Sequence, residues 1–305
     1  MTFSRITTLM TTNQILGEIN QSQNALATTE QQLSTGKTIN APSDNPYGAA
    51  LAVQLNGQLA QLNDYNSNIV DGQAWTQTGS TAISAMQSDV QRAQELVTEA
   101  ANGTMSPSQL NDVGAELTQI VAAIKSSANT QYNGQYVFSG TATSTPAYDA
   151  SGSYLSGGAY SPVTRQIGPA SQSTVSVDLS QALGTNTDPA TGSGLLSELG
   201  AIANNLSSGS PSTSGLSAAL SDIQDGLSKL SSLATNLGAA TDQMTMASTT
   251  ISDMQTSVTA DLSNDEDANM ATTMTTYSNE EAAFTAALKA GASIVQTSLM
   301  DFLTG

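Results

Sequence analysis

A long apolar repeat in the second half of the chain limits what the chain can fold into. Every seventh residue from position 216 to position 258 is apolar: Leu216, Ile223, Leu230, Leu237, Met244, Ile251 and Val258. A companion series four residues further on runs from Leu220 to Leu262 and turns polar after Ala234. A 4-3 repeat of this kind is typical of a long helix that packs along another helix. At ~1.5 Å per residue this helix would be roughly 70 Å long, which predicts a helical rod.

The composition excludes several classes of function. The net charge is −18, and the seven basic residues are scattered, so no nucleic-acid partner is expected, because phosphate contacts need clustered Lys and Arg. The absence of Cys and His removes disulfides, typical zinc sites and the usual general base. We find no G-x-S-x-G, phosphate-loop or H-E-x-x-H motif, and therefore predict a protein that is no enzyme and uses no cofactor or metal.

The two ends of the chain each predict a weakly amphipathic helix. In residues 4–34 two apolar series interleave, and from Phe284 to Phe302 residues of a further seam recur at 4-3 spacing. Helices with such thin seams are marginal alone, so we expect them to pair with each other and with neighbouring copies. The predicted assembly residues are Leu9, Leu16, Ile19, Leu26, Leu33, Leu288, Val295, Leu299 and Phe302.

A helix–loop–helix joint follows the first predicted helix. Gly36 is a plausible helix stop, and Pro42 and Pro46 prevent a continuous helix. Ser43 or Asp44 could cap the next helix, with Pro46 in its first turn. The residues that define this joint motif are Gly36, Asn40, Pro42, Asp44 and Pro46.

The remaining segments complete a mainly α fold. Residues 46–101 and 107–133 predict an antiparallel helical hairpin, and residues 195–206 predict a further helix. Residues 135–139, 163–167 and 174–179 predict strands. We therefore expect a long antiparallel helical rod or coiled coil with paired terminal helices and a small β-rich insert. The predicted domains are 1–45 with 263–305 for assembly, 46–138 with 195–262 for the rod, and 139–194 for a surface-exposed insert.

The chain resembles the bacterial flagellin superfamily at both ends, roughly over residues 1–140 and 195–305, and four short stretches carry this resemblance. Residues 33–40 (LSTGKTIN) are similar to the joint of that family. Residues 42–46 (PSDNP), 133–140 (NGQYVFSG) and 298–303 (SLMDFL) are similar to its hook–filament junction proteins. Flagellins usually carry alanines in place of the two prolines. Asn45 departs from the family, which more often has an acidic residue there.

The resemblance implies a structural subunit that links hook to filament by self-assembly of its terminal helices. It implies a homo-oligomeric ring, contacts with a neighbouring hook-associated protein and with flagellin, and an export chaperone. The location implied is the extracellular flagellum, reached by type III export. This fits the first ten residues, which lack the apolar run of a cleavable signal peptide, and we expect no membrane insertion. The alternatives are a minor flagellin of the filament and an adhesive or glycan-binding surface module.

Two local patterns admit a binding interpretation beside a plain structural one. Oxygen-bearing residues alternate along 261–267 as in a calcium loop, but Glu266 stands where that loop needs glycine, so a solvated bend is favoured. Three tyrosines of the insert, Tyr148, Tyr154 and Tyr160, could bind sugars or another protein, although ordinary packing in the insert is the default expectation.

Overall fold

The computed structural model describes residues 8–149, 152–155, 159–186, 194–208 and 213–304. Only the backbone is described for residues 8, 9, 11, 12, 213, 214 and 294–304. The helices are α1 (Thr8–Thr35), α2 (Pro46–Ala101), α3 (Pro107–Ala128), α4 (Ser180–Leu183), α5 (Leu195–Ser207), α6 (Thr213–Glu266) and α7 (Met270–Thr304). The strands are β1 (Gln131–Tyr132), β2 (Gln135–Tyr136), β3 (Thr164–Gly168) and β4 (Ser171–Thr174). The fold is therefore mainly α, as the sequence predicts.

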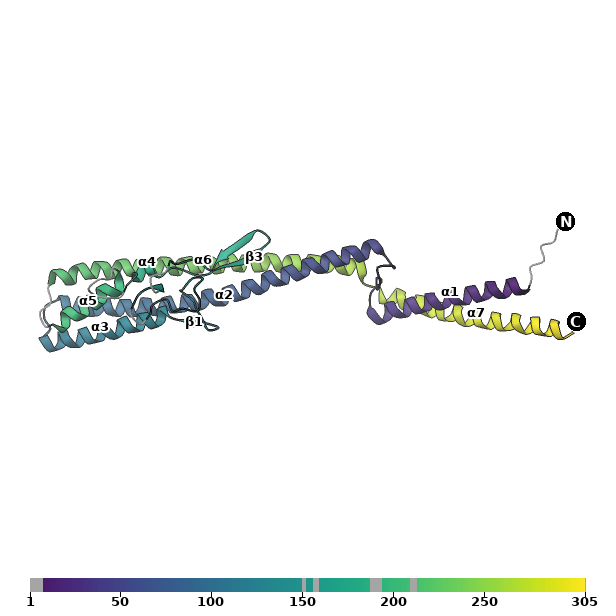
Figure 1. Ribbon diagram of the computed structural model, residues 1–305, viewed down its shortest axis with the longest axis horizontal. Coiled ribbons are helices and arrows are strands. Elements are labelled where there is room, and N and C mark those ends of the chain that lie inside the picture. The colour runs from purple at the N-terminus through teal and green to yellow at the C-terminus, as the bar shows by residue number, and fades with distance from the viewer. Residues whose placement is uncertain (1–7, 150–151, 156–158, 187–193, 209–212, 305) are drawn as a thin grey trace. The chain divides into compact units, whose positions relative to one another are not determined.

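The chain divides into two compact units. One consists of Met1–Gln61 and Met254–Gly305, and the other of Leu62–Asp253. In the first unit α1 and α7 pack side by side and antiparallel (Figure 1). Helices α2 and α6 contribute residues to both units. The three-part division expected from the sequence, with limits at 45/46 and 262/263, stays a prediction about domains.

The apolar repeat that predicts the long helix is confirmed in α6. All seven residues of the first series are buried, with relative exposures from 0% at Met244 to 6% at Val258. The companion series differs from the prediction, because Leu220, Leu227 and their successors are only half-buried. The second buried series lies three residues after the first instead, at Ala219, Gly226, Leu233 and Ala240. Its small residues let neighbouring helices approach α6 closely.

In the second unit α6 lies in a helical bundle with α2, α3 and α5 (Figure 1). Helix α2 runs antiparallel to α6, since Thr76 contacts Thr241 (3.0 Å between hydroxyl oxygens) and Gln73 donates to Thr245. The predicted hairpin of α2 and α3 is supported by the bond from Arg92 Nε to a Glu116 carboxylate oxygen at 2.9 Å. Helix α3 begins with a capping box between Ser106 and Gln109, with Pro107 as its first residue.

A tight hairpin follows α3, and it corrects the predicted end of that helix at residue 133. Helix α3 ends at Ala128, five residues before Asn133, and β1 pairs with β2 across Asn133 and Gly134. Both turn residues have positive φ (48° and 77°), which is the signature of a type I′ hairpin turn. The strand expected over residues 135–139 is confined to Gln135–Tyr136.

The insert is less regular than its alternating sequence suggests. Strands β3 and β4 form an antiparallel hairpin, which confirms the strand near residues 163–167. The prediction of a strand over residues 174–179 is wrong beyond Thr174, where β4 ends. The Ser176 hydroxyl accepts the Val163 N–H at 2.8 Å, and the preceding Pro162 has no N–H, so side-chain bonding replaces the ladder there. Val175 and Val177 are nevertheless buried, in extended chain.

One side chain of the insert anchors it to α2. Arg165 Nε donates to the Asp71 carboxylate at 2.9 Å, and its guanidinium lies 5.7 Å from the centre of the Trp75 ring. Trp75 is 1% exposed, and its ring meets Tyr132 edge-on at 6.1 Å. Trp75 therefore serves packing, and the insert and α2 share one core.

Candidate assembly site

The seam between α1 and α7 is built mainly from small and polar side chains of α7. Thr29 of α1 is buried and its hydroxyl donates to Glu280. Gly291 is buried beneath α1, where an added Cβ would lie 3.3 Å from side-chain atoms of both Ile15 and Ile19. Thr273 is also buried. The pairing of α1 with α7 therefore includes a close backbone approach at Gly291. Tyr277 and Phe284 of α7 are half-buried, whereas Met270, Met274 and Leu288 are exposed.

The structure separates the predicted assembly residues into three groups. Ile19, Leu26 and Leu33 are half-buried on the face of α1 that carries Thr29. Leu16 and Leu288 lie outside the seam, with 52% and 45% of their surface exposed. The side chains of Leu9, Val295, Leu299 and Phe302 lie outside the described part of the chain, although all four positions are helical.

Exposed large apolar side chains gather on this unit. Within the described part of the chain, the exposed large apolar residues of the second unit are Val70 and Met246. The exposed large apolar residues of the first unit are Met10, Leu16, Tyr47, Val53, Met254, Met270, Met274 and Leu288. Scattered exposed apolar residues are common, but their distribution between the two units is uneven. We call these eight residues of the first unit the terminal apolar surface.

The joint beside the terminal helices is a small hydrogen-bonded structure. Gly36 ends α1 with φ +72°, a conformation that favours glycine. Its carbonyl accepts the Ala268 N–H at 2.8 Å, and the Thr38 N–H donates to the Glu266 carbonyl at 2.6 Å. Lys37 and Asp267 thus form an antiparallel bridge between two segments that lie far apart in the sequence. This bridge ties the start of the joint to the turn between α6 and α7.

An ion pair reinforces the bridge. The Lys37 ammonium contacts a carboxylate oxygen of Glu266, whose side chain is 10% exposed. Sequence reasoning missed this pair. The sequence shows a lysine in the joint segment and an acidic run at residues 265–267, but nothing in the sequence indicates that the two would pair. A buried carboxylate next to one ammonium is costly to leave unpaired.

Removal of the Lys37 charge should loosen the joint. Lys37→Met keeps an unbranched side chain but leaves the Glu266 carboxylate without its ammonium, which costs about 1–3 kcal/mol. We expect the Thr38 and Ala268 amides to exchange with solvent about tenfold faster or more, measured by hydrogen–deuterium exchange. Arg92→Met is the control, because Arg92 makes an exposed pair with Glu116 that is worth little. Unchanged exchange at both joint amides would exclude a stabilising role for the pair.

The remaining joint residues hold the loop and start α2. The Asp44 carboxylate accepts the N–H groups of Asn40 and Ala41 at 3.0 and 2.8 Å. The predicted cap at Ser43 or Asp44 is wrong, because the Asn45 side chain accepts the Gly48 N–H at 3.0 Å and Pro46 follows it. The structure therefore assigns a function to the residue that departs from the family pattern. Pro42 lies exposed within the loop.

The Asp44 carboxylate should make the loop sensitive to acid. The Ala41 N–H, and after it the Asn40 N–H, hold its pKa below the ordinary value of 3.8. Since the folded pKa is depressed, the contribution to stability is present above the unfolded pKa and is lost as pH falls through the folded pKa. NMR titration of the Asn40 and Ala41 amide shifts should give a midpoint below 3.8, and Asp44→Asn should abolish it. A midpoint above 3.8 would contradict these bonds.

The two local binding patterns have structural roles here. Residues 261–266 belong to α6, and the Ser263 hydroxyl donates to Asp267, so the calcium-like pattern is helix and helix end, not a loop. Tyr148 and Tyr154 are buried, and their hydroxyls donate to the carbonyls of Gly184 and Phe138. Burial raises the pKa of both phenols. These two rings form the core of the insert.

Comparison with known proteins relates the N-terminal part of this arrangement to flagellins. Residues 6–143 match the bacterial flagellin N-terminal helical region, and a flagellin of Salmonella muenchen is 37% identical over 117 residues. The N-terminal part of the chain is therefore similar to the corresponding part of flagellins. That alignment covers 38% of this chain and 23% of the Salmonella protein, so the chain spans about a quarter of the length of this curated relative. The resemblance seen in the joint sequence is thus confirmed for residues 6–143.

Two solved structures share the fold of this chain. A Vibrio parahaemolyticus protein provisionally assigned as a flagellar hook-associated protein has a TM-score of 0.66 and 20% identity, covering 73% of this chain and all of its own. The flagellar junction protein FlgL of Legionella pneumophila has a TM-score of 0.56 and 13% identity, covering 71% of this chain and 99% of its own. At these identities the likeness establishes the fold. No helix within the described residues is long and apolar enough to span a bilayer.

Proposed function

We propose that this chain is a structural subunit of the bacterial flagellum that joins the hook to the filament and carries out no catalysis. The observation that carries the proposal is the terminal apolar surface, which gathers on the unit built from the two chain ends. The names of the two proteins with the same fold, one hook-associated and one a junction protein, agree with this role.

Assembly would use the terminal helices in two layers. Ile19, Leu26 and Leu33 pack within the pair of α1 and α7, and Leu16 and Leu288 face outward toward a neighbouring subunit. Burial of each large apolar side chain contributes ~1.5–3 kcal/mol, so several per copy offset the entropy lost on association. Leu9, Val295, Leu299 and Phe302 would extend the same contacts. Folding of the terminal helices and polymerisation would then stabilise each other.

The proposed partners follow from this position in the flagellum. Copies of the chain would form a ring that contacts a hook-associated protein on one side and flagellin on the other. The chain would leave the cell by flagellar type III export with the help of a chaperone. Residues 1–45 and 263–305 would form the assembly domain, residues 46–138 and 195–262 the rod, and residues 139–194 the exposed insert.

A minor flagellin is the second candidate, because the curated relatives with up to 37% identity are flagellins. The prolines at positions 42 and 46 and the run Tyr136–Gly140 favour the junction role instead. Purified protein distinguishes the two functions. A junction subunit should stay in short oligomers in sedimentation and electron microscopy, because a ring needs hook and filament on its two sides. Long filaments formed by the purified chain alone would identify a flagellin.

A further inference from the structure

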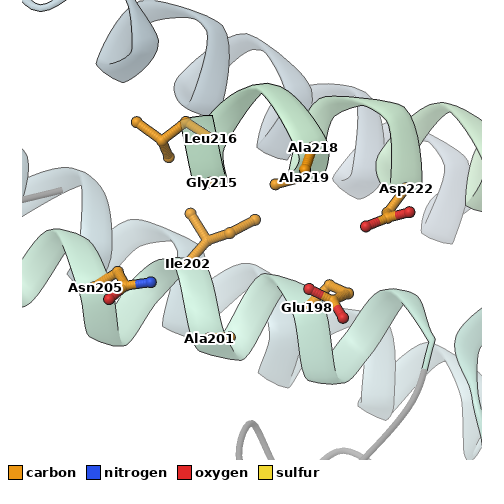
Figure 2. Close-up of a pocket in the computed structure, with 9 residues that line it drawn as sticks. All are labelled: Glu198, Ala201, Ile202, Asn205, Gly215, Leu216, Ala218, Ala219 and Asp222. Atoms are coloured by element: carbon orange, nitrogen blue, oxygen red, sulfur yellow. The ribbon is translucent and has the colours of Figure 1, made fainter. Parts of the chain in front are cut away.

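A groove lies between α5 and the beginning of α6. Its main hollow has a volume of about 250 Å³ and is lined by Glu198, Ala201, Ile202, Asn205, Gly215, Leu216, Ala218, Ala219 and Asp222. Figure 2 shows Ile202 pointing from α5 toward α6, with the carboxylates of Glu198 and Asp222 on opposite sides of the gap. A second hollow of about 150 Å³ continues the groove and shares these two acidic residues.

The size of the groove indicates what can occupy it. Pockets for drug-sized ligands usually measure ~300–1,000 Å³, and this hollow is smaller than that range. It suits a side chain or two from another protein. Such a partner would leave most of its own surface outside the groove, as a helix does when it inserts an anchor residue into a cleft.

The lining combines an apolar floor with an acidic rim. Ala201 and Ala218 supply accessible aliphatic surface above the buried Ile202 and Leu216, while Glu198 is half-buried and Asp222 is exposed. Asp225 adds a third carboxylate in the second hollow, where Lys229 is the one base among the lining residues. Arg and Lys match this lining, because each has an aliphatic stem that packs on apolar surface and a cationic head that bonds to carboxylates.

A second copy of this chain is poorly suited to fill the groove. The chain carries a net charge of −18 and only seven basic residues. Lys37, Arg92 and Arg165 are already paired with Glu266, Glu116 and Asp71. Charge complementarity therefore requires a different protein, one that presents a basic amphipathic segment.

We propose that the groove between α5 and α6 docks a basic helical segment of another protein, which inserts an Arg or Lys side chain between Glu198 and Asp222. The inserted stem packs on Ala201 and Ala218, and flanking basic residues reach Asp225. This docking site lies in the second unit, apart from the terminal apolar surface, and does not depend on the proposed junction role.

Calorimetric titration of the full chain with a synthetic amphipathic peptide of Leu and Arg tests the proposal. The Glu198→Gln and Asp222→Asn double variant should raise the Kd about tenfold, because it removes both charged partners of the inserted side chain. Ala218→Leu, at an exposed position of the groove lining, should also weaken binding severalfold by filling the hollow. The matched control is the double variant Asp242→Asn and Asp253→Asn, two exposed acids of α6 away from the groove.

The control variant should bind the peptide within about twofold of the natural chain, and a peptide of Leu and Glu should not bind. If both double variants raised the Kd of the Leu and Arg peptide equally, the proposal would be overturned, because the peptide would then bind through unspecific attraction to the negative charge of the chain. Absence of binding by the Leu and Arg peptide, or an unchanged Kd in the groove variants, would overturn it as well.

Discussion

A chain that carries both Leu16→Glu and Leu288→Glu should fail to enter flagella while its second unit stays folded. Both side chains are about half exposed and lie outside the seam between α1 and α7, so the substitutions leave that seam intact. In an assembled ring each change would remove ~1.5–3 kcal/mol of apolar burial and would add a carboxylate that must lose its water. The loss recurs in every subunit, so incorporation should fall below detection.

Complementation of a deletion strain with the variant gene measures this loss, with filaments counted by electron microscopy. The control variant carries Asn20→Glu and Ala283→Glu, which add the same charge at exposed positions of the same helices without removing a large apolar group. The control should restore filaments. If the Leu16 and Leu288 variant restored them as well, the terminal apolar surface could not be the assembly surface.

Replacement of Trp75 by Ala should destabilise the second unit by about 3–5 kcal/mol, the usual cost of removing a fully buried aromatic side chain. Trp75 is 1% exposed and contacts both Tyr132 and the Arg165 guanidinium, so the cavity also weakens the attachment of the insert to α2. Urea unfolding followed by far-UV circular dichroism should show a clearly lower midpoint for this unit.

Trp75→Phe provides the comparison for this second prediction. It keeps an aromatic ring in the same place and should lose less stability, because a smaller cavity remains. The first unit, which does not contain residue 75, should keep its own transition. An unchanged midpoint for Trp75→Ala would mean that the insert does not share a core with α2.

The long helices could be predicted because burial repeats with the helical period over many turns. In α6 a buried apolar residue, such as Leu230 or Met244, occurs at every seventh position. Each repeat adds independent evidence for the same buried face of the helix. The exact second seam could not be predicted in this way. Ala219 and Gly226 are small, and only their contacts with neighbouring helices show that they, and not Leu220 and Leu227, are fully buried.

The joint and the insert were harder to predict for a different physical reason. Their conformation depends on hydrogen bonds between residues that no short-range pattern relates, such as Lys37 with Glu266 or Val163 with Ser176. Asn45 and Asp44 are both plausible caps by residue type, and only the main-chain geometry decides that Asn45 caps α2 while Asp44 closes the loop. The outward position of Leu16 likewise became visible only after α1 was paired with α7.

The junction role is tested most directly by deletion of the gene, followed by electron microscopy of the cells and measurement of flagellin in the medium. We expect intact hooks without filaments, with flagellin lost to the medium, because nothing would join the two structures. Filaments of normal number and length on the deletion strain would contradict it.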